Sequence, residues 1–579
     1  MQSNNKTPQI SIKDSGVDLF YSIFRNSFLK RVLINKVLEN SIIVITNDDI
    51  ISNSNNSKYK YLSNISAIEK LENNISIRFL INDLQQFKQY LNSIFKYVIN
   101  DLKFGDGFDV SVTSTVNQEP GQQLIQFDFN LLHQDLHRLS FSIMDGAKFG
   151  DDIDNDDSCI ITLPPSLTEL NMQESYRYRF YEGIYRSHSY DRFLSNLPQS
   201  IKKLTLPYKY VIGLDKLVLP NSLCYFNYQP RDINNLKKLV MPTRKNLPLS
   251  CLCFDNIFIK RTQDLEWIRN HSWFTTLNFA VEDNDNEGVI KANVIPPNIE
   301  HLNANKYLIE QGSLPQTLVS LSLNGDHPLS NGIFPSGLHV LHIHHLHQEL
   351  IKHLLPESLE ILTIQRCSKP IPPNTLPSNL LNLDLRIYEF NFTVGLFPSS
   401  LTQLSVTKYN NSLDPFVLPQ CLKKLKIIQF NNQLVANSLP PSLTKLKIPE
   451  YDRSFDLLSP LPNLKSIEVY KLNESIVELI SNNIQDLKIS FNRMDYNVSL
   501  YHTSINRLFL KSNSSLKSNL YARLLPQSLV KLKIIHIIIE PNMNSILPNS
   551  CVYLETDFIN LNLDLLPKSI KYLNKKFIK

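Results

Sequence analysis

The stretch LPPSLTKLKI at residues 439–448 is one copy of a phrase that recurs about every 21 residues along much of the chain. Other clear copies are LPPSLTELNM (163–172), LPQSIKKLTL (197–206), LPESLEILTI (355–364) and LPQSLVKLKI (525–534). A fixed period of 20–50 residues is the signature of a solenoid, in which each unit is too small to fold alone. The sequence therefore predicts a repeat protein rather than a set of independent globular domains.

We call the leucine that follows Pro-x-Ser the anchor of each unit. Six consecutive steps between anchors, from Leu338 to Leu464, are 21 residues each. The Leu-x-x-Leu-x-Leu ending alternates with period two, which is typical of a short strand with one buried face. We therefore predict a leucine-rich-repeat-like solenoid with a parallel concave β-sheet and mostly non-helical return segments. The later anchors are Ile299, Leu318, Leu338, Leu359, Leu380, Leu401, Leu422, Leu443, Leu464, Ile484, Ile505, Leu529, Cys551 and Ile570. Looser units at Leu167, Ile201 and Leu223 and degraded ones at Cys251 and Phe274 bring the total to about 19.

Composition narrows the classes of function. The 59 basic and 54 acidic residues leave a net charge of only +5, so we expect no general nucleic-acid binding. Seven irregularly spaced cysteines do not fit a disulfide framework. The N-terminus lacks the apolar core of a signal peptide, and no stretch is long and apolar enough to span a membrane. We expect a cytoplasmic protein, with the nucleus as an alternative, and no membrane contact.

A second pattern lies upstream of the Leu-Pro of several units. The aromatic-Asn pairs are Phe430-Asn431, nine residues before Leu439-Pro440, Tyr409-Asn410, nine before Leu418-Pro419, and Phe390-Asn391, seven before Phe397-Pro398. With the repeated phrase, these pairs resemble the FNIP repeat, which is named for Phe-Asn-Ile-Pro. The full tetrapeptide is absent, so the copies are diverged. The resemblance covers about 160–579 and implies a leucine-rich-repeat-like interaction module with no known chemistry.

The region before the repeats is predicted to be different. Residues 1–105 are expected to be mixed but mainly helical, because apolar residues recur at helical spacing over 17–40 and again from Leu84 to Val98. Residues 106–160 are expected to form a transition with strand-like alternation at 108–116 and 124–132, a worn first coil at 136–143 and an acidic loop at 150–157. The solenoid is predicted to occupy 161–579.

The most distinctive candidate surface is a row of basic residues in the C-terminal half. Side chains two and four positions after each anchor should point away from the core, toward the concave sheet face. These positions hold Lys424, Lys426, Lys445, Lys447, Lys488, Arg507, Lys531 and Lys533, interrupted by Glu468 and Asp486. Clustered charge favours encounter with an acidic partner. Lysines that only keep exposed strands soluble are the alternative interpretation.

Motifs for chemistry are weak. His342 and His344 should share the outward face of one strand, but the neighbouring units supply no third metal ligand. No P-loop, nucleophile elbow or kinase phrase is present, so we expect no enzyme activity, no metal and no cofactor.

The predicted function is non-catalytic binding of a protein partner on the concave face. One alternative is an adaptor whose N-terminal region docks a ubiquitin-ligase or other scaffold. Some FNIP-repeat proteins carry an F-box for that purpose, but its Leu-Pro-x-Glu-Ile start is absent here. The other alternative is an enzyme with a site in the N-terminal region. The sequence fixes neither the partner nor the oligomeric state.

Overall fold

The computed structural model describes residues 27–577 apart from 53–58, 60–61, 106–130, 143–161, 174–187, 208–209, 229, 231–232, 243–251, 254–257, 260, 280–287, 306, 326–327, 482, 515–517, 540–545, 558–565 and 575. The chain divides into two units, Met1–Phe258 and Ile259–Lys579, which we call unit 1 and unit 2. Each unit is built around one long sheet, and each is described here by itself.

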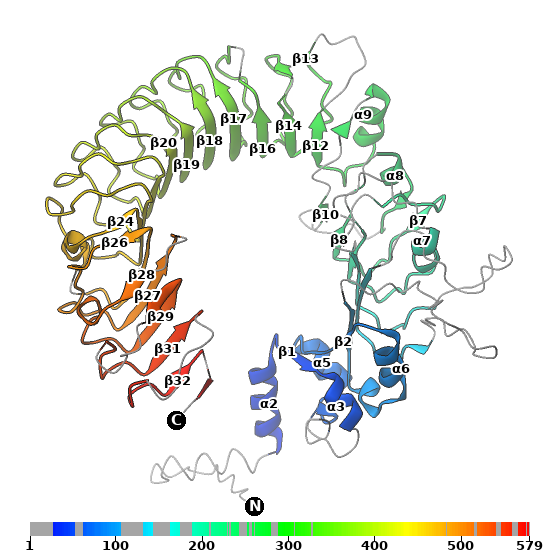
Figure 1. The fold of residues 1–579 in the computed structure, drawn as a ribbon. Coiled ribbons are helices and arrows are strands. Elements are labelled where there is room, and N and C mark those ends of the chain that lie inside the picture. The colour runs from blue at the N-terminus through cyan, green and yellow to red at the C-terminus, as the bar shows by residue number, and fades with distance from the viewer. Residues whose placement is uncertain are drawn as a thin grey trace, which may run out of the picture. The chain divides into compact units, whose positions relative to one another are not determined.

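Unit 2 carries a 17-stranded sheet among its described residues. Its strands line the inner side of an arc, and the return segments form the outer side (Figure 1). From β12 onward neighbouring strands pair in parallel, until β32 meets β33 antiparallel. Register partners are 21 residues apart between β17 and β23, as with Gln403 and Lys424, and 19 to 25 residues apart elsewhere. The strands are β11 (Phe258–Ile259), β12 (Thr276–Phe279), β14 (His301–Ala304), β16 (Ser320–Leu323), β17 (Val340–Leu346), β18 (Ile361–Cys367), β19 (Asn382–Ile387), β20 (Gln403–Lys408), β21 (Lys424–Ile427), β22 (Lys445–Ile448), β23 (Ser466–Val469), β25 (Asp486–Phe491), β27 (Arg507–Ser512), β29 (Lys531–Ile535), β31 (Tyr553–Thr556), β32 (Tyr572–Leu573) and β33 (Lys576–Phe577). The predicted parallel solenoid is confirmed.

The return segments of unit 2 are mostly non-helical, as predicted. After α9 (Thr262–Arg269), the described residues hold only the short 3₁₀ turns η6 (Glu474–Leu479) and η7 (Ala522–Leu524). Short parallel pairs join some returns: β13 (Val289–Ile290) with β15 (Leu308–Ile309), β24 (Lys471–Leu472) with β26 (Arg493–Met494), and β28 (Ser518–Leu520) with β30 (Ile537–Ile539).

Each part of the repeated phrase has a structural role. The anchors from Ile299 to Ile570 are all buried, which confirms their predicted place in the core. The proline opens a tight turn: the Leu443 N–H donates to the Pro440 carbonyl at 3.2 Å, and the same bond recurs in most units. The serine, to which sequence reasoning assigned no role, joins adjacent coils. Ser442 donates its hydroxyl to the carbonyl of Leu422, the anchor of the preceding coil, at 2.7 Å. Equivalent bonds are made by Ser358, Ser400, Ser528 and Ser550.

The aromatic-Asn pairs build the return side of the core. Phe430 and Tyr451 are fully buried and stacked, with ring centroids 6.0 Å apart. The asparagine that follows each ring links coils, since Asn410 Oδ1 accepts the N–H of Asn431 at 2.8 Å. Asn431 Oδ1 in turn accepts the N–H of Asp452 at 3.1 Å. The FNIP-like pair is therefore a device for stacking coils rather than a surface for ligands.

The structure also explains why Phe390-Asn391 lies seven residues before its Phe-Pro, rather than the nine seen in the other two units. Tyr388, nine residues before Phe397-Pro398, is the buried ring of that coil, while Phe390 is only half-buried. Phe392 packs beneath the next coil and stacks on Tyr409 with centroids 4.0 Å apart. Tyr388-Glu389 therefore takes the place of the aromatic-Asn pair in this coil.

Unit 1 is also a sheet, so the prediction of a mainly helical N-terminal region is wrong. Its described residues hold an eight-stranded parallel sheet in the order β1 (Ile42–Ile45), β2 (Ser76–Ile81), β3 (Asp101–Phe104), β4 (Arg138–Ser142), β5 (Glu169–Gln173), β6 (Lys203–Thr205), β8 (Tyr225–Asn227) and β10 (Leu252–Cys253). A further pair joins β7 (Leu217–Val218) to β9 (Leu239–Val240). The helices are α2 (Ser27–Leu38), α3 (Asn47–Ser52), α5 (Ala67–Glu72), α6 (Leu84–Asn92), η2 (Ile94–Tyr97), α7 (His188–Leu194) and α8 (Ile233–Lys237).

The error has a physical cause. β1 and β2 are 34 residues apart in register, at Ile42 and Ser76, so the return segment between them is long enough to hold helices. The helical patterns near 17–40 and 84–98 match α2, α6 and η2, but α6 and η2 lie between parallel strands. The worn coil predicted at 136–143 is β4, yet three strands precede it. The strand predicted at 108–116, the strand predicted at 124–132 except its last two residues, and the acidic loop at 150–157 lie outside the described residues.

The sheet of unit 1 runs across both predicted domain boundaries, because β3 pairs with β4 and β4 with β5. The division into 1–105, 106–160 and 161–579 stays a prediction.

Candidate functional site

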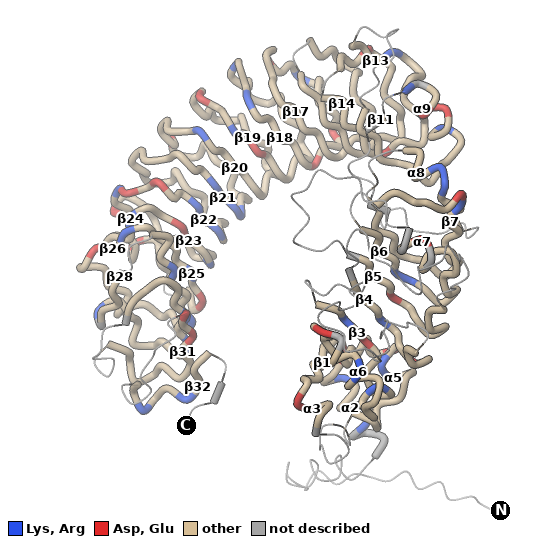
Figure 2. Tube along the Cα trace, turned by 45° about the vertical axis from the view of Figure 1, so that its right-hand side comes forward, with Lys and Arg blue, Asp and Glu red and all other residues tan. Residues whose placement is uncertain are grey.

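Basic side chains gather on the inner sheet face of unit 2. Lys424 and Lys426 on β21 are exposed and alternate with buried Leu425 and Ile427. The same alternation on β22 places Lys445 and Lys447 outward. In Figure 2 the basic residues of β21 and β22 lie along the inner side of the arc of unit 2. The predicted orientation of these four lysines is therefore confirmed, and we call them the lysine cluster.

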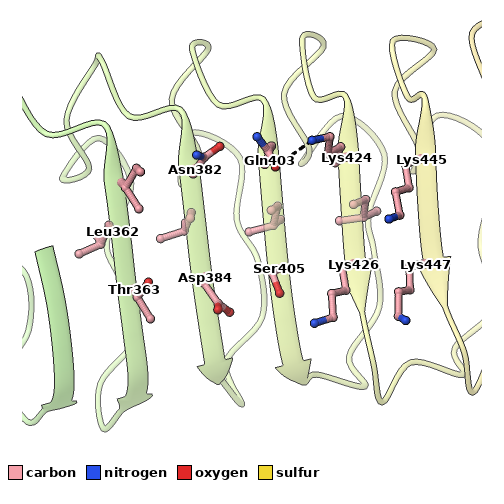
Figure 3. Close-up of a pocket in the computed structure, with 14 residues that line it drawn as sticks. Leu362, Thr363, Asn382, Asp384, Gln403, Ser405, Lys424, Lys426, Lys445 and Lys447 are labelled. Atoms are coloured by element: carbon pink, nitrogen blue, oxygen red, sulfur yellow. Dashed lines mark hydrogen bonds between the residues drawn. The ribbon is translucent and has the colours of Figure 1, made fainter. Parts of the chain in front are cut away.

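Strand register sets the lysine cluster in a two-by-two array. Lys424 lies directly opposite Lys445, and Lys426 directly opposite Lys447 (Figure 3). Neighbouring strands are about 4.8 Å apart. Like charges in directly opposite positions destabilise a sheet, so the array brings no gain to folding.

Little within the molecule offsets these charges. Lys447 forms an ion pair with Glu468 at 2.9 Å, and Lys424 donates a hydrogen bond to the side-chain oxygen of Gln403 at 3.3 Å. Lys424, Lys426 and Lys445 take part in no ion pair with the described residues. The cluster therefore presents three lysines without an acidic neighbour.

The other four basic candidates are engaged locally. Arg507 pairs with Asp486 at 2.5 Å. Lys531 and Lys533 both reach Glu555, at 2.7 and 3.2 Å. The hydrogen bond from Lys531 is the main reason that the pKa of Glu555 lies below its usual value. Lys488 lies over the ring of Phe509, with its ammonium 4.8 Å from the centroid.

The structure therefore brings four of the eight candidates together, and three of these four take part in no ion pair with the described residues. Glu555 is the residue that sequence reasoning missed, although it stands four positions after the anchor Cys551. The outward-position rule applied to that unit would have found it.

A cavity of about 390 Å³ lies beside the lysine cluster on the same sheet face. Figure 3 shows the polar side chains that reach it from neighbouring strands, among them Asp384 of β19 and Ser405 of β20. Its lining consists of Ile361, Leu362, Thr363, Asn382, Leu383, Asp384, Gln403, Leu404, Ser405, Lys424, Leu425, Lys426, Lys445 and Lys447. The cavity and the cluster form one surface that runs from β18 to β22.

Unit 1 shows how the same kind of face looks when its charges are balanced. Across successive strands Arg78 pairs with Asp101 at 2.8 Å, and Arg138 with Glu169 at 3.5 Å. Lys203 also reaches Glu169, at 3.7 Å. Basic and acidic residues thus alternate from strand to strand. The lysine cluster of unit 2 departs from this arrangement.

The histidine pair lies on the same face of unit 2. His342 is paired in register with Ser322 and Thr363, so the strands beside it bring no metal ligand. Burial is the main cause that lowers the pKa of His342. Within the part of the chain that the structure describes, no three His, Cys, Asp or Glu side chains are grouped to hold a metal ion. No helix in that part has the length and apolar character needed to cross a membrane.

Comparison with known proteins identifies the repeat. The family model described as FNIP Repeat matches residues 409–451, which include β21, β22 and the four residues of the lysine cluster. The comparison with curated proteins gives no match. Among solved structures, the chain is similar to CroV588, described as a novel circular LRR protein, at 21% identity with a TM-score of 0.46. That match covers 86% of this chain and 74% of the other.

Proposed function

Because the chain contains FNIP repeats within a leucine-rich-repeat-like solenoid, we propose that it is a non-catalytic protein-binding scaffold. Its partner binds the inner sheet face of unit 2, with acidic side chains on the lysine cluster and neighbouring groups in the cavity. Stacked repeats commonly serve as extended concave binding surfaces. The observation that carries the proposal is the array of Lys424, Lys426 and Lys445 without acidic neighbours.

The solubility interpretation accounts less well for this array. Lysines that serve only to keep strands soluble do not need to lie opposite one another, where repulsion opposes folding. Unit 1 and the last strands of unit 2 carry basic residues at equivalent positions with acidic partners beside them. An array of lysines without such acidic partners is better explained by a binding partner that supplies the missing acidic groups.

No feature of the described residues supports the adaptor or the enzyme alternative as the lysine cluster supports protein binding, so both stay predictions. The cytoplasmic location also stays a prediction.

The test compares two triple variants of the full chain. The cluster variant is Lys424→Gln, Lys426→Gln and Lys445→Gln. The control variant is Lys352→Gln, Lys369→Gln and Lys465→Gln, which removes the same charge from exposed positions that do not line the cavity. The probe is a fluorescein-labelled hexaglutamate peptide, measured by fluorescence anisotropy.

We expect the cluster variant to weaken binding about tenfold, since three exposed ion pairs at about 0.5 kcal/mol each amount to about 1.4 kcal/mol. The control should bind like the unmodified chain, and binding should weaken as salt rises because exposed charges are screened. Equal affinities for the two variants, or an affinity insensitive to salt, would show that the cluster is not the binding site. Affinity purification with the same variants then identifies the natural partner.

A further inference from the structure

We propose that the segment bound by this face is bipolar: a cationic residue sits at Asp384 and acidic residues, three and four positions along the segment, sit on the lysine cluster. The inference rests on the proposed function and specifies the chemistry of the partner. It is carried by the position of Asp384 in the same cavity as the lysines.

The β19 end of the cavity is rich in acceptors without donors. Asp384 Oδ1 and Asn382 Oδ1 are both covered and accept no hydrogen bond from described residues. The register partners of Asp384 are Thr363 and Ser405, which bring no positive charge. The one ion-pair contact of Asp384 in the described chain is with Arg386, two residues along its own strand, at 4.0 Å.

An acceptor without a donor costs free energy in the unbound protein. A cationic group from outside would pair with the Asp384 carboxylate, and modest rotation of the two side chains would let it reach the orphaned oxygens. Figure 3 shows Asp384 at one side of the cavity and the lysines at the other. The cavity is thus negative at its β19 side and positive at β21 and β22.

Register fixes the distance between the two charges. Asp384, Ser405, Lys426 and Lys447 form one continuous row across four strands. At about 4.8 Å per strand, β21 with Lys426 and β22 with Lys445 lie about 10 and 14 Å from β19, the strand of Asp384. An extended chain advances about 3.3–3.6 Å per residue, so these distances correspond to three and four residues. A segment that crosses the strands at right angles therefore matches both ends of the cavity.

The same arrangement disfavours a uniform polyanion. A nucleic-acid backbone carries negative charge at every step, and the part of it above β19 would meet the carboxylate of Asp384. Repulsion of that kind is a common means of rejecting wrong partners. Asp384 therefore favours an acidic protein segment that also carries one positive charge.

The experiment uses the full chain and two labelled peptides. The bipolar peptide is Gly-Arg-Ser-Gly-Glu-Glu-Gly, and the acidic peptide has Gln in place of Arg. Affinities are measured by anisotropy for the unmodified chain, for the cluster variant, for Asp384→Asn and for the control Asp414→Asn, an exposed acid on the return side of unit 2. Oligouridylate of ten nucleotides is the third probe.

We expect the bipolar peptide to bind about threefold more tightly than the acidic peptide, and Asp384→Asn to abolish that difference. The control should preserve it. Equal affinities of the two peptides for the unmodified chain would overturn the bipolar inference. If both peptides then bound the cluster variant more weakly, the proposed function would still be supported. Failure of both peptides to bind would overturn both proposals. Oligouridylate that binds the unmodified chain more tightly than either peptide does would replace the protein segment with a nucleic acid.

Discussion

Two phenylalanines in one coil of unit 2 should respond to mutation in opposite directions. Phe430 is fully buried beneath β21, where it stacks on Tyr451 with nearly parallel rings. Phe416, fourteen residues earlier, is 62% exposed and has a backbone φ of 61°. A bulky residue in this left-handed region is strained, and the same position in the neighbouring coils holds Asn374, Gly395 and Asn437, which tolerate it.

Phe430→Ala should destabilise its coil by about 3–5 kcal/mol. Removing the ring forfeits the transfer free energy of its buried surface, about 2–3 kcal/mol. The rest is the cost of a cavity, which the hydrogen-bonded coils on either side cannot close. Phe416→Asn should instead stabilise the protein by about 0.5–1 kcal/mol, because asparagine adopts the left-handed conformation at lower cost.

Hydrogen exchange with mass spectrometry is the suitable assay, because a long solenoid need not unfold in one step. Repeat stability is carried by nearest neighbours. Phe430→Ala should therefore speed exchange about a hundredfold or more in β20, β21 and β22 and leave β29 and β31 unchanged. Phe416→Asn should slow exchange in the same coils. Uniform acceleration along unit 2, or similar losses for both variants, would refute the coil-by-coil account of the core.

Three further results are expected. Ser442→Ala removes the bond to the Leu422 carbonyl and should cost about 1 kcal/mol, seen as faster exchange in β21 and β22, whereas the control Ser412→Ala, at an exposed position, should not. Burial lowers the pKa of His137 to about 4, so its uncharged form stabilises unit 1 above the unfolded pKa of about 6.5. That stability, on the order of 2 kcal/mol, should be lost as pH falls from about 6.5 to 4. Hydrogen exchange in β3 and β4 should therefore depend less on pH in His137→Asn than in the unmodified chain. The charged and titratable groups that also act on this ring are Lys70, Asp135, Arg138 and His133. Glu555→Gln should free Lys531 and Lys533 and create a second salt-sensitive site for hexaglutamate, detectable as increased stoichiometry.

The N-terminal region shows why periodicity alone failed there. The repeats of unit 2 can be recognised in the sequence because their return segments have nearly the same length. In unit 1 the returns vary and some hold helices, so the short strands recur without a fixed period. The strongest local signal in that region is then the helical one, as in α6, although long-range pairing of β2 with β3 builds the sheet.

The candidate site divides in a similar way. Outward positions followed from the anchors, and the structure confirms them for Lys424, Lys426, Lys445 and Lys447. Pairing further along the sheet did not follow from the anchors, because the register slips between β23 and β25. Anchors place Ser466 beside Asp486, but the sheet pairs Ser466 with Lys488. A slip of two residues keeps every side chain on its face while changing its neighbour.

The sequence by itself determined the solenoid, its period of about 21 residues, the buried anchors and the faces on which polar side chains lie, because these follow from local alternation repeated along the chain. Only the tertiary structure decided which charges lie together. Glu468 neutralises Lys447 and Glu555 neutralises Lys531, whereas Lys426 and Lys445 take part in no ion pair with the described residues and line the same cavity as Asp384. Ion pairs form over a few ångströms between residues a full coil apart, so they depend on strand register and side-chain direction rather than on spacing in the sequence.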